Sequence, residues 1–309
     1  MNKAAWMSGK YGIMVHYLSH IANAEGKKEL SVEEMADRFD VKSFADSIEK
    51  MGASWVIFPI GQNTGYYWSE NPFIEERIQG RCTKRDLIFD LADELYNRGI
   101  KLIAYLPVEV DFQEEDIRKA FRWNESPDRK EFMKIWTSVV RYYAEKLGKR
   151  LNGWWFDGAY DAAEKDFTVT KDWNNKRFVK SEWFDAAKAG NSDAVISMNT
   201  GADIMGYVFE EEEYLGGEVN DLTHFPWDYE SMDKQWHALT YLDCFWMLAE
   251  GNTMPEPRFT DDELCGYVME CLNKKGAVTL NIGIDENGIL AYKTVEQICR
   301  LKSFLKSNS

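Results

Sequence analysis

Short apolar runs recur along the chain, and most of them are separated by stretches in which apolar residues follow helical spacing. Runs of this kind, bounded by turn residues, are typical of strands that are buried on both faces. The pattern predicts strands at residues 12–16, 54–60, 102–106, 153–157, 194–199 and 278–282. It predicts helices at about residues 31–51, 84–98, 127–147, 176–190, 261–275 and 293–305.

The alternation of strand and helix predicts an α/β fold with a parallel sheet. Two more strands are expected between Gly206 and Phe245, and no Pro/Gly-rich linker divides the chain. We therefore predict a single domain over residues 1–309 with the architecture of a TIM-like (β/α)8 barrel. A doubly wound open sheet is the alternative, but no G-x-G-x-x-G follows the first strand, where a dinucleotide-binding fold needs it.

Composition narrows the class of partner. The formal charge of −15 disfavours nucleic acid and anionic membranes, which the protein would repel, and leaves a neutral ligand compatible. The longest apolar runs are far shorter than a membrane span, so no membrane partner is expected. The first residues lack the apolar region of a signal peptide, which predicts a cytoplasmic protein. The five cysteines form no C-x-x-C pair, so neither a disulfide framework nor a zinc ribbon is expected.

The most informative segment is Trp154-Trp155-Phe156-Asp157-Gly158, an apolar run that stops on a carboxylate and a glycine. In a parallel barrel the carboxyl ends of the strands share one mouth, where catalytic residues gather. Asp157 is therefore a candidate catalytic residue, although an aspartate in this position also commonly caps a turn. The chain has 12 tryptophans, which can fill a core or stack their flat faces on sugars.

Polar and aromatic side chains follow the other predicted strands in the same way. Amide, hydroxyl and imidazole groups can hydrogen-bond several sugar hydroxyls, and aromatic rings supply apolar walls. A ring of such residues around a carboxylate predicts a carbohydrate-binding pocket. The candidate residues are His16, Gln62, Asn63, Tyr66, Trp68, Tyr105, Trp155 and Asn199.

Several of these features have simpler interpretations. His16 alone is often a hydrogen-bonded structural histidine, and residues 63–65 suit an ordinary turn. His16 and His20 are four residues apart, but the first lies on a strand, so a helical zinc pair is not expected. The acidic run 210–213 is typical of a solvated or helix-starting face, with calcium binding as the alternative. Residues 285–288 resemble a calcium loop but lack its glutamate at the twelfth position, which favours a turn.

Several segments together resemble glycoside hydrolase family 29, the α-L-fucosidases. Residues 11–17 (YGIMVHY) are similar to that family's F-G-I-F-x-H-W, and residues 84–87 (KRDL) to its helix-opening R-D-L. Residues 155–158 match the W-F-D-G that carries the family's nucleophile, and residues 278–288 (VTLNIGIDENG) resemble its closing L-L-L-N-I-G-P-x-x-D-G. The resemblance covers nearly the whole chain but not the family's C-terminal β-sandwich, which we expect to be missing.

The resemblance is weaker in the sugar-binding motif. Where the family has K-H-H-D-G-F after the second strand, this chain has GQNTGY, so two histidines that hold fucose hydroxyls become Gln62 and Asn63. The family's paired tyrosines after the third strand become Tyr105 and Leu106. The alternatives to a fucoside are therefore another sugar, such as an α-L-galactoside, or a sugar-binding barrel without activity. A metal-dependent hydrolase is disfavoured by the four histidines and the lack of an H-x-H strand.

The resemblance implies a retaining exo-glycosidase that needs no metal or organic cofactor and acts on a carbohydrate. Asp157 would be the nucleophile, and a second carboxylic acid would protonate the leaving oxygen and then activate water. The family places that acid in a variable loop after the sixth strand, and our choice is Glu218, which follows two glycines. The alternatives are Glu211, Glu213 and Asp221. The expected stacking walls are Trp68, Trp155 and Trp227. One side of the barrel, left uncovered without the sandwich, would allow self-association into a homo-oligomer.

Overall fold

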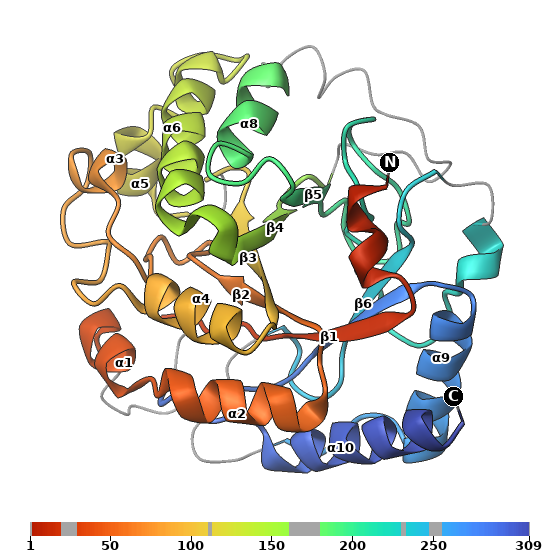
Figure 1. The fold of residues 1–309 in the computed structure, drawn as a ribbon. Coiled ribbons are helices and arrows are strands. Elements are labelled where there is room, and N and C mark those ends of the chain that lie inside the picture. Colours follow the sequence, from red (N-terminus) through yellow and green to blue (C-terminus); the bar gives the residue numbers. More distant parts are fainter. Residues whose placement is uncertain are drawn as a thin grey trace.

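The computed structural model describes residues 2–19, 30–110, 113–160, 180–229, 233–246 and 255–308. In these residues seven parallel strands form one curled sheet (Figure 1). The strands are β1 (Lys10–Met14), β2 (Trp55–Pro59), β3 (Lys101–Pro107), β4 (Leu151–Asp157), β5 (Val195–Met198), β6 (His237–Tyr241) and β7 (Ala277–Asn281). Nearly every strand position is buried, because core side chains cover both faces of the sheet.

The strands follow one another round the sheet in chain order. That order is β5-β4-β3-β2-β1-β7-β6, so the first strand pairs with the last, with Met14 opposite Asn281. A doubly wound sheet would instead reverse its order at a switch point, so that alternative is wrong. The predicted α/β fold with a parallel, TIM-like sheet is confirmed.

The sequence predicted two further strands between Gly206 and Phe245, and β6 is one of them. Residues 213–219 lie between β5 and β6 as an irregular segment. The Glu213 N–H donates to the Ile196 carbonyl oxygen of β5 at 3.0 Å, and the Val219 N–H donates to the Leu239 carbonyl oxygen of β6 at 2.8 Å. The segment therefore hydrogen-bonds to both open edges of the sheet, but it contributes isolated bridges rather than a continuous strand.

Helices surround the sheet (Figure 1). They are α1 (Val32–Arg38), α2 (Val41–Met51), α3 (Pro72–Glu75), α4 (Leu87–Asn97), α5 (Glu115–Ala120), α6 (Lys130–Leu147), α8 (Lys180–Ala187), α9 (Asp261–Asn273) and α10 (Tyr292–Ser307), with short 3-10 helices η1 (Lys3–Met7), η2 (Gly148–Arg150) and η3 (Pro226–Tyr229). The predicted helix at 31–51 is two helices, because the Asp40 carboxylate accepts two backbone N–H groups and caps the start of α2. The start of the helix predicted at 176–190 lies outside the described residues.

The sheet separates two apolar cores, one between the strands and the helices and one inside the curl of the sheet. Alternation along β4 places Trp154 and Phe156 in the outer core and Trp155 in the inner core. Asp157 lies two residues after Trp155 and so shares its inward face, at the carboxyl end of the strand. This is the position from which a strand presents a side chain to the mouth of a parallel barrel.

Candidate active site

Asp157 ends β4 and is only 5% exposed. Two tyrosines bind its carboxylate, the Tyr105 hydroxyl donating to Oδ2 at 2.7 Å and the Tyr160 hydroxyl donating to Oδ1 at 2.9 Å. The Asn199 side-chain amide also donates to Oδ1, at 2.9 Å. Gly158 follows with a φ of 93°, a left-handed conformation that favours glycine. Three neutral donors therefore hold a buried carboxylate in one orientation.

Glu218 lies beside Asp157 and is joined to it through Asn199. The Asn199 Nδ2 that binds Asp157 also donates to Oε2 of Glu218, at 2.6 Å. Oδ1 of Asp157 and Oε2 of Glu218 bind the same nitrogen. The distance between these two oxygens is therefore at most the sum of the two hydrogen-bond lengths, about 5.5 Å. Burial and the negative charge of Asp157 raise the pKa of Glu218 to about 7. The cluster therefore contains a carboxyl group that can hold a proton near neutral pH.

The two glycines before Glu218 bring its loop against both neighbouring strands. A Cβ atom on Gly216 would lie 2.7 Å from the carbonyl oxygen of Met198 in β5. One on Gly217 would lie 2.0 Å from the carbonyl oxygen of His237 in β6, and Gly217 also has a φ of 71°. Only glycine allows so close an approach, so these two residues determine where Glu218 lies.

The other acidic residues of this loop lie elsewhere. Glu211 and Asp221 are exposed, and Glu213 forms an ion pair with Lys188. Glu212 is 1% exposed and accepts three backbone N–H groups, so the prediction of a solvated face is wrong at this position. Burial raises the pKa of Glu212 to about 8, although the three donors act in the opposite direction. Because one of these donors belongs to the last residue of β5, Glu212 ties the loop to that strand.

His16 lies two residues beyond the end of β1, beside the Asp157 cluster. Its ring is edge-on to the Tyr105 ring at a centroid distance of 5.5 Å, and its Nδ1 is 2.8 Å from Oδ1 of Asn281, the last residue of β7. Burial lowers the pKa of His16, which favours the neutral imidazole. With the amide oxygen as acceptor, Nδ1 carries the proton and Nε2 is left as an acceptor.

The loop after β2 carries Gln62, Asn63 and Tyr66, all of them half-buried. The Gln62 side chain lies within hydrogen-bonding reach of the Tyr105 hydroxyl, and its Oε1 accepts the Asn63 N–H at 2.7 Å. The Tyr66 ring instead packs under the Arg81 guanidinium, 4.6 Å from its centroid. Gln62 therefore reaches the Asp157 cluster through Tyr105.

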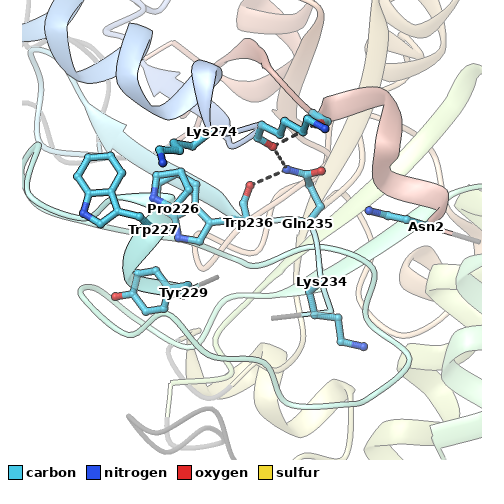
Figure 2. A pocket seen from close by; sticks show the side chains of 10 residues that line it. Asn2, Pro226, Trp227, Tyr229, Lys234, Gln235, Trp236 and Lys274 are labelled. Carbon is cyan, nitrogen blue, oxygen red and sulfur yellow. Dashed lines mark hydrogen bonds between the residues drawn. The ribbon is translucent and has the colours of Figure 1, made fainter. Parts of the chain in front are cut away.

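The three tryptophans expected as stacking walls lie apart from one another. Trp155 is 2% exposed and packs its ring against Tyr105, with centroids 5.0 Å apart. Trp68 is 1% exposed in the outer core, where its indole donates to a backbone carbonyl. Trp227 lines a pocket (Figure 2) together with residues that precede β1, β6 and β7. Those residues stand before the strands begin, whereas Asp157 ends a strand, so the pocket lies at the opposite end of the sheet. Burial leaves the first two no face for a sugar, and the expected place of Trp227 beside the site is wrong.

Three residues that the sequence did not single out complete the cluster. Tyr160 binds Asp157, and Asn281 binds His16 while its own buried Nδ2 has no partner among the described residues. Trp246 follows β6 with a φ of 46°, and its ring lies 5.6 Å from the His16 ring. Tyr160 could have been found from the sequence, because it follows the strand-ending aspartate by only three residues. The contact of Trp246 with His16 could not, because these two residues are far apart in the chain and meet only in the folded structure.

In the described part of the chain, no group of three or more His, Cys, Asp or Glu side chains gathers as a metal site would require. Asp285 accepts the backbone N–H groups of Asn287 and Ile289, so residues 285–288 form the predicted turn. None of the described helices is both long and apolar enough to span a bilayer.

Comparison with protein families agrees with this arrangement of residues. The family model for alpha-L-fucosidase matches residues 2–309, almost the entire chain. The chain belongs to the alpha-L-fucosidase family. The resemblance drawn from its motifs is therefore confirmed, and it places the protein among the glycoside hydrolases. No curated protein sequence matches the chain significantly.

Solved structures with a fold similar to that of this alpha-L-fucosidase family member include an endo-fucoidan hydrolase and two alpha-L-fucosidases. The endo-fucoidan hydrolase MfFcnA4 of glycoside hydrolase family 107 aligns with a TM-score of 0.72 and 15% identity over 98% of this chain and 53% of its own. The family 29 alpha-L-fucosidase from Bacteroides thetaiotaomicron aligns with a TM-score of 0.65 and 14% identity over 99% and 74% of the two chains. AlfC from Lactobacillus casei aligns with a TM-score of 0.67 and 12% identity over 99% and 98%. The chain thus spans about half of the first hydrolase, and at these identities the likeness shows a shared fold.

Proposed function

We propose that this protein is a retaining exo-acting α-L-fucosidase in which Asp157 is the nucleophile and Glu218 the acid/base. The observation that carries the proposal is the Asn199 amide shared by the two carboxyl groups, which keeps their oxygens within about 5.5 Å. Retaining glycosidases hold their carboxyl groups about 5 to 5.5 Å apart, whereas inverting ones need about 6.5 Å or more to admit a water. Membership of the family supports an α-L-fucoside as the substrate.

In the first step an oxygen of Asp157 attacks the anomeric carbon while the bond to the leaving oxygen breaks. Glu218 passes its proton to that leaving oxygen, and its raised pKa of about 7 supports this role at neutral pH. In the second step Glu218 takes a proton from a water, whose oxygen attacks the same carbon and releases Asp157. The charge of Asp157, which helps to raise the pKa of Glu218, is absent in the ester intermediate, so the pKa of Glu218 falls there and its ionised carboxylate is available as the base.

The sugar hydroxyls would be bound by groups that surround Asp157. The Nε2 atom of His16 would supply an acceptor, and the Nδ2 atom of Asn281, which has no partner among the described residues, would supply a donor. Trp246, beside His16, takes the role of the apolar wall that the sequence assigned to other tryptophans. The remaining proposed contacts are Gln62, Asn63, Tyr66, Tyr105 and Asn199.

We also propose that residues 213–219 act as an irregular eighth strand that completes a single barrel domain. The hydrogen bonds of this segment to Ile196 and Leu239 on the two edges of the sheet support this closure. An irregular strand at this place has a functional consequence, because its end carries Glu218 to the mouth of the sheet.

The test is release of nitrophenol from a panel of aryl glycosides headed by the α-L-fucoside, with NMR detection of the first anomer formed. Asp157→Asn should abolish turnover. Glu218→Gln should slow natural fucosides by about a hundredfold or more while sparing aryl substrates with good leaving groups, since these need no proton. Glu211→Gln, an exposed glutamate of the same loop, is the matched control.

The panel also separates the alternatives. Because Gln62 and Asn63 replace two histidines of the family motif, another sugar such as an α-L-galactoside is the second candidate. Turnover of that sugar alone would keep the mechanism and overturn the specificity. Inversion of the anomeric centre would overturn the assignment of Asp157 as nucleophile, and silence across the panel would favour a sugar-binding barrel without activity.

A further inference from the structure

A pocket of about 340 Å³ lies at the opposite end of the sheet from Asp157. It forms where β1, β6 and β7 begin, between η3, the residues beside η1 and the segment that follows α9 (Figure 2). Its volume is within the range of small-molecule sites, which begins at about 300 Å³. None of the residues placed in the catalytic cluster lines it.

Three aromatic side chains line this pocket, from Trp227, Tyr229 and Trp236. One face of Trp227 stacks on Phe225, with centroids 4.2 Å apart and planes 15° from parallel, so the indole is held as a flat platform. Trp236 is 5% exposed, and its buried Nε1–H has no hydrogen-bond partner in the described part of the chain. Trp236 therefore adds a largely buried ring to the wall of the pocket.

The charge of the pocket differs in sign from that of the protein. The chain carries a formal charge of −15, yet Lys234, Lys274 and Lys275 line the pocket, and no acidic residue does so among the residues that the structure describes. The Lys234 amino group is bound to the carbonyl oxygen of Glu210. The amino groups of the other two lysines form no hydrogen bond or ion pair with the described residues. The amino groups of Lys274 and Lys275 are thus available to pair with an anion, and they lie in the same pocket as the flat Trp227 ring. This combination favours an anionic ligand with a flat apolar face.

We propose that this pocket is an accessory binding site for a saccharide that carries an anionic substituent, a sulfate or a carboxylate. The sugar ring stacks on Trp227, and the anionic group pairs with Lys274 and Lys275. The choice of a saccharide rests on the proposed function, whereas the anionic class follows from the lining itself. Because the pocket lies at the far end of the sheet, it holds a long polysaccharide without occupying the catalytic cluster.

Native affinity electrophoresis tests the proposal, with a sulfated fucan in the gel, the same polymer after desulfation, or polygalacturonate as the carboxylated probe. The full chain is compared with Trp227→Ala and with the double variant Lys274→Ala/Lys275→Ala. The lysine variant alters exposed side chains only, so it keeps the test valid if the tryptophan variant folds poorly. Hydrolysis of an aryl glycoside should be unchanged in both variants, because neither residue set touches the catalytic cluster.

Two controls match the changes in chemistry. Tyr96→Ala removes an aromatic side chain that is 54% exposed on α4, and Lys134→Ala/Lys149→Ala removes two exposed lysines elsewhere. We expect an anionic polymer to retard the wild-type protein, the two pocket variants to raise its dissociation constant about tenfold, and the controls to change nothing. Equal retardation of wild type and pocket variants, or no retardation by either anionic polymer, would overturn the proposal.

The remaining outcomes are also decisive. Equal binding of the desulfated fucan would overturn the anionic assignment, and a difference between sulfated fucan and polygalacturonate would identify the preferred anion. Asp157→Asn should bind like the wild type, because its site is at the other end. If no protein hydrolyses any aryl glycoside while retardation still depends on Trp227, the proposed function fails and the accessory site stands.

Discussion

The half-buried acid Glu218 allows a prediction that needs no knowledge of the substrate. Its folded-state pKa of about 7 lies above the ordinary value of 4.5, because burial and the charge of Asp157 disfavour ionisation. A carboxyl group whose pKa is raised on folding stabilises the protein below its unfolded pKa, and this contribution is lost as the pH rises through the folded pKa. Glu218→Gln removes this ionisation, so the variant should gain stability relative to the wild type at alkaline pH.

The size of the effect follows from the two pKa values. At about 1.4 kcal/mol per pH unit, the gap between 4.5 and about 7 corresponds to about 3 kcal/mol in total. About 2.5 kcal/mol of this loss in unfolding free energy occurs between about pH 5 and about pH 8.5, since part of the loss is already complete at the lower pH. The titration of Glu212 is present in both proteins and therefore cancels in the comparison.

Urea unfolding at these two pH values measures the effect, because urea leaves the ionic strength constant. The free energy of unfolding of Glu218→Gln minus that of the wild type should increase by about 2.5 kcal/mol from the acidic to the alkaline condition. Glu211→Gln controls for the loss of one negative charge from an exposed position in the same loop. A difference that is the same at both pH values would refute the reasoning, since Glu218 would then not bind its proton more tightly in the folded state.

Four further outcomes are expected. The rate of hydrolysis of a natural fucoside, whose leaving oxygen needs a proton, should fall above about pH 7 as Glu218 loses its proton, and a rate that stays flat to pH 9 on this substrate would exclude Glu218 as the acid. Tyr160→Phe removes a donor to Asp157 and should lower kcat/KM by about tenfold, whereas an unchanged value would mean that the hydrogen bond is irrelevant to the reaction. Gly217→Ala should destabilise the protein by about 2 kcal/mol or more, because its Cβ would lie 2.0 Å from a strand carbonyl oxygen, and an unchanged urea midpoint would contradict this contact. Glu212→Gln turns an amide NH2 toward backbone N–H donors and should lower the unfolding free energy by about 1–3 kcal/mol, measured in urea at constant pH; equal stability would show that the three bonds are dispensable.

Local pattern was enough to predict most of the sheet and the candidate nucleophile. The strands predicted at 54–60, 102–106 and 153–157 correspond to β2, β3 and β4, because a strand buried on both faces is apolar at nearly every position. The place of Asp157 follows from the end of that apolar run, since a parallel sheet presents its carboxyl ends at one mouth. The choice of Glu218 as acid/base rested on the two glycines that precede it and on the loop in which the resembled family places its acid, and this role stays a proposal.

Only the tertiary structure shows which of several tryptophans fills a core and which lines a pocket. Trp155 fills the inner core, Trp68 the outer core, and Trp227 lines a pocket at the opposite end, although all three are the same amino acid. Residues 213–219 have no strand pattern, and they lie between β5 and β6 because the sheet leaves two edges that their N–H and carbonyl groups can satisfy. The raised pKa of Glu218 likewise depends on burial and on a charge distant in the chain, which only the folded sheet brings to its side.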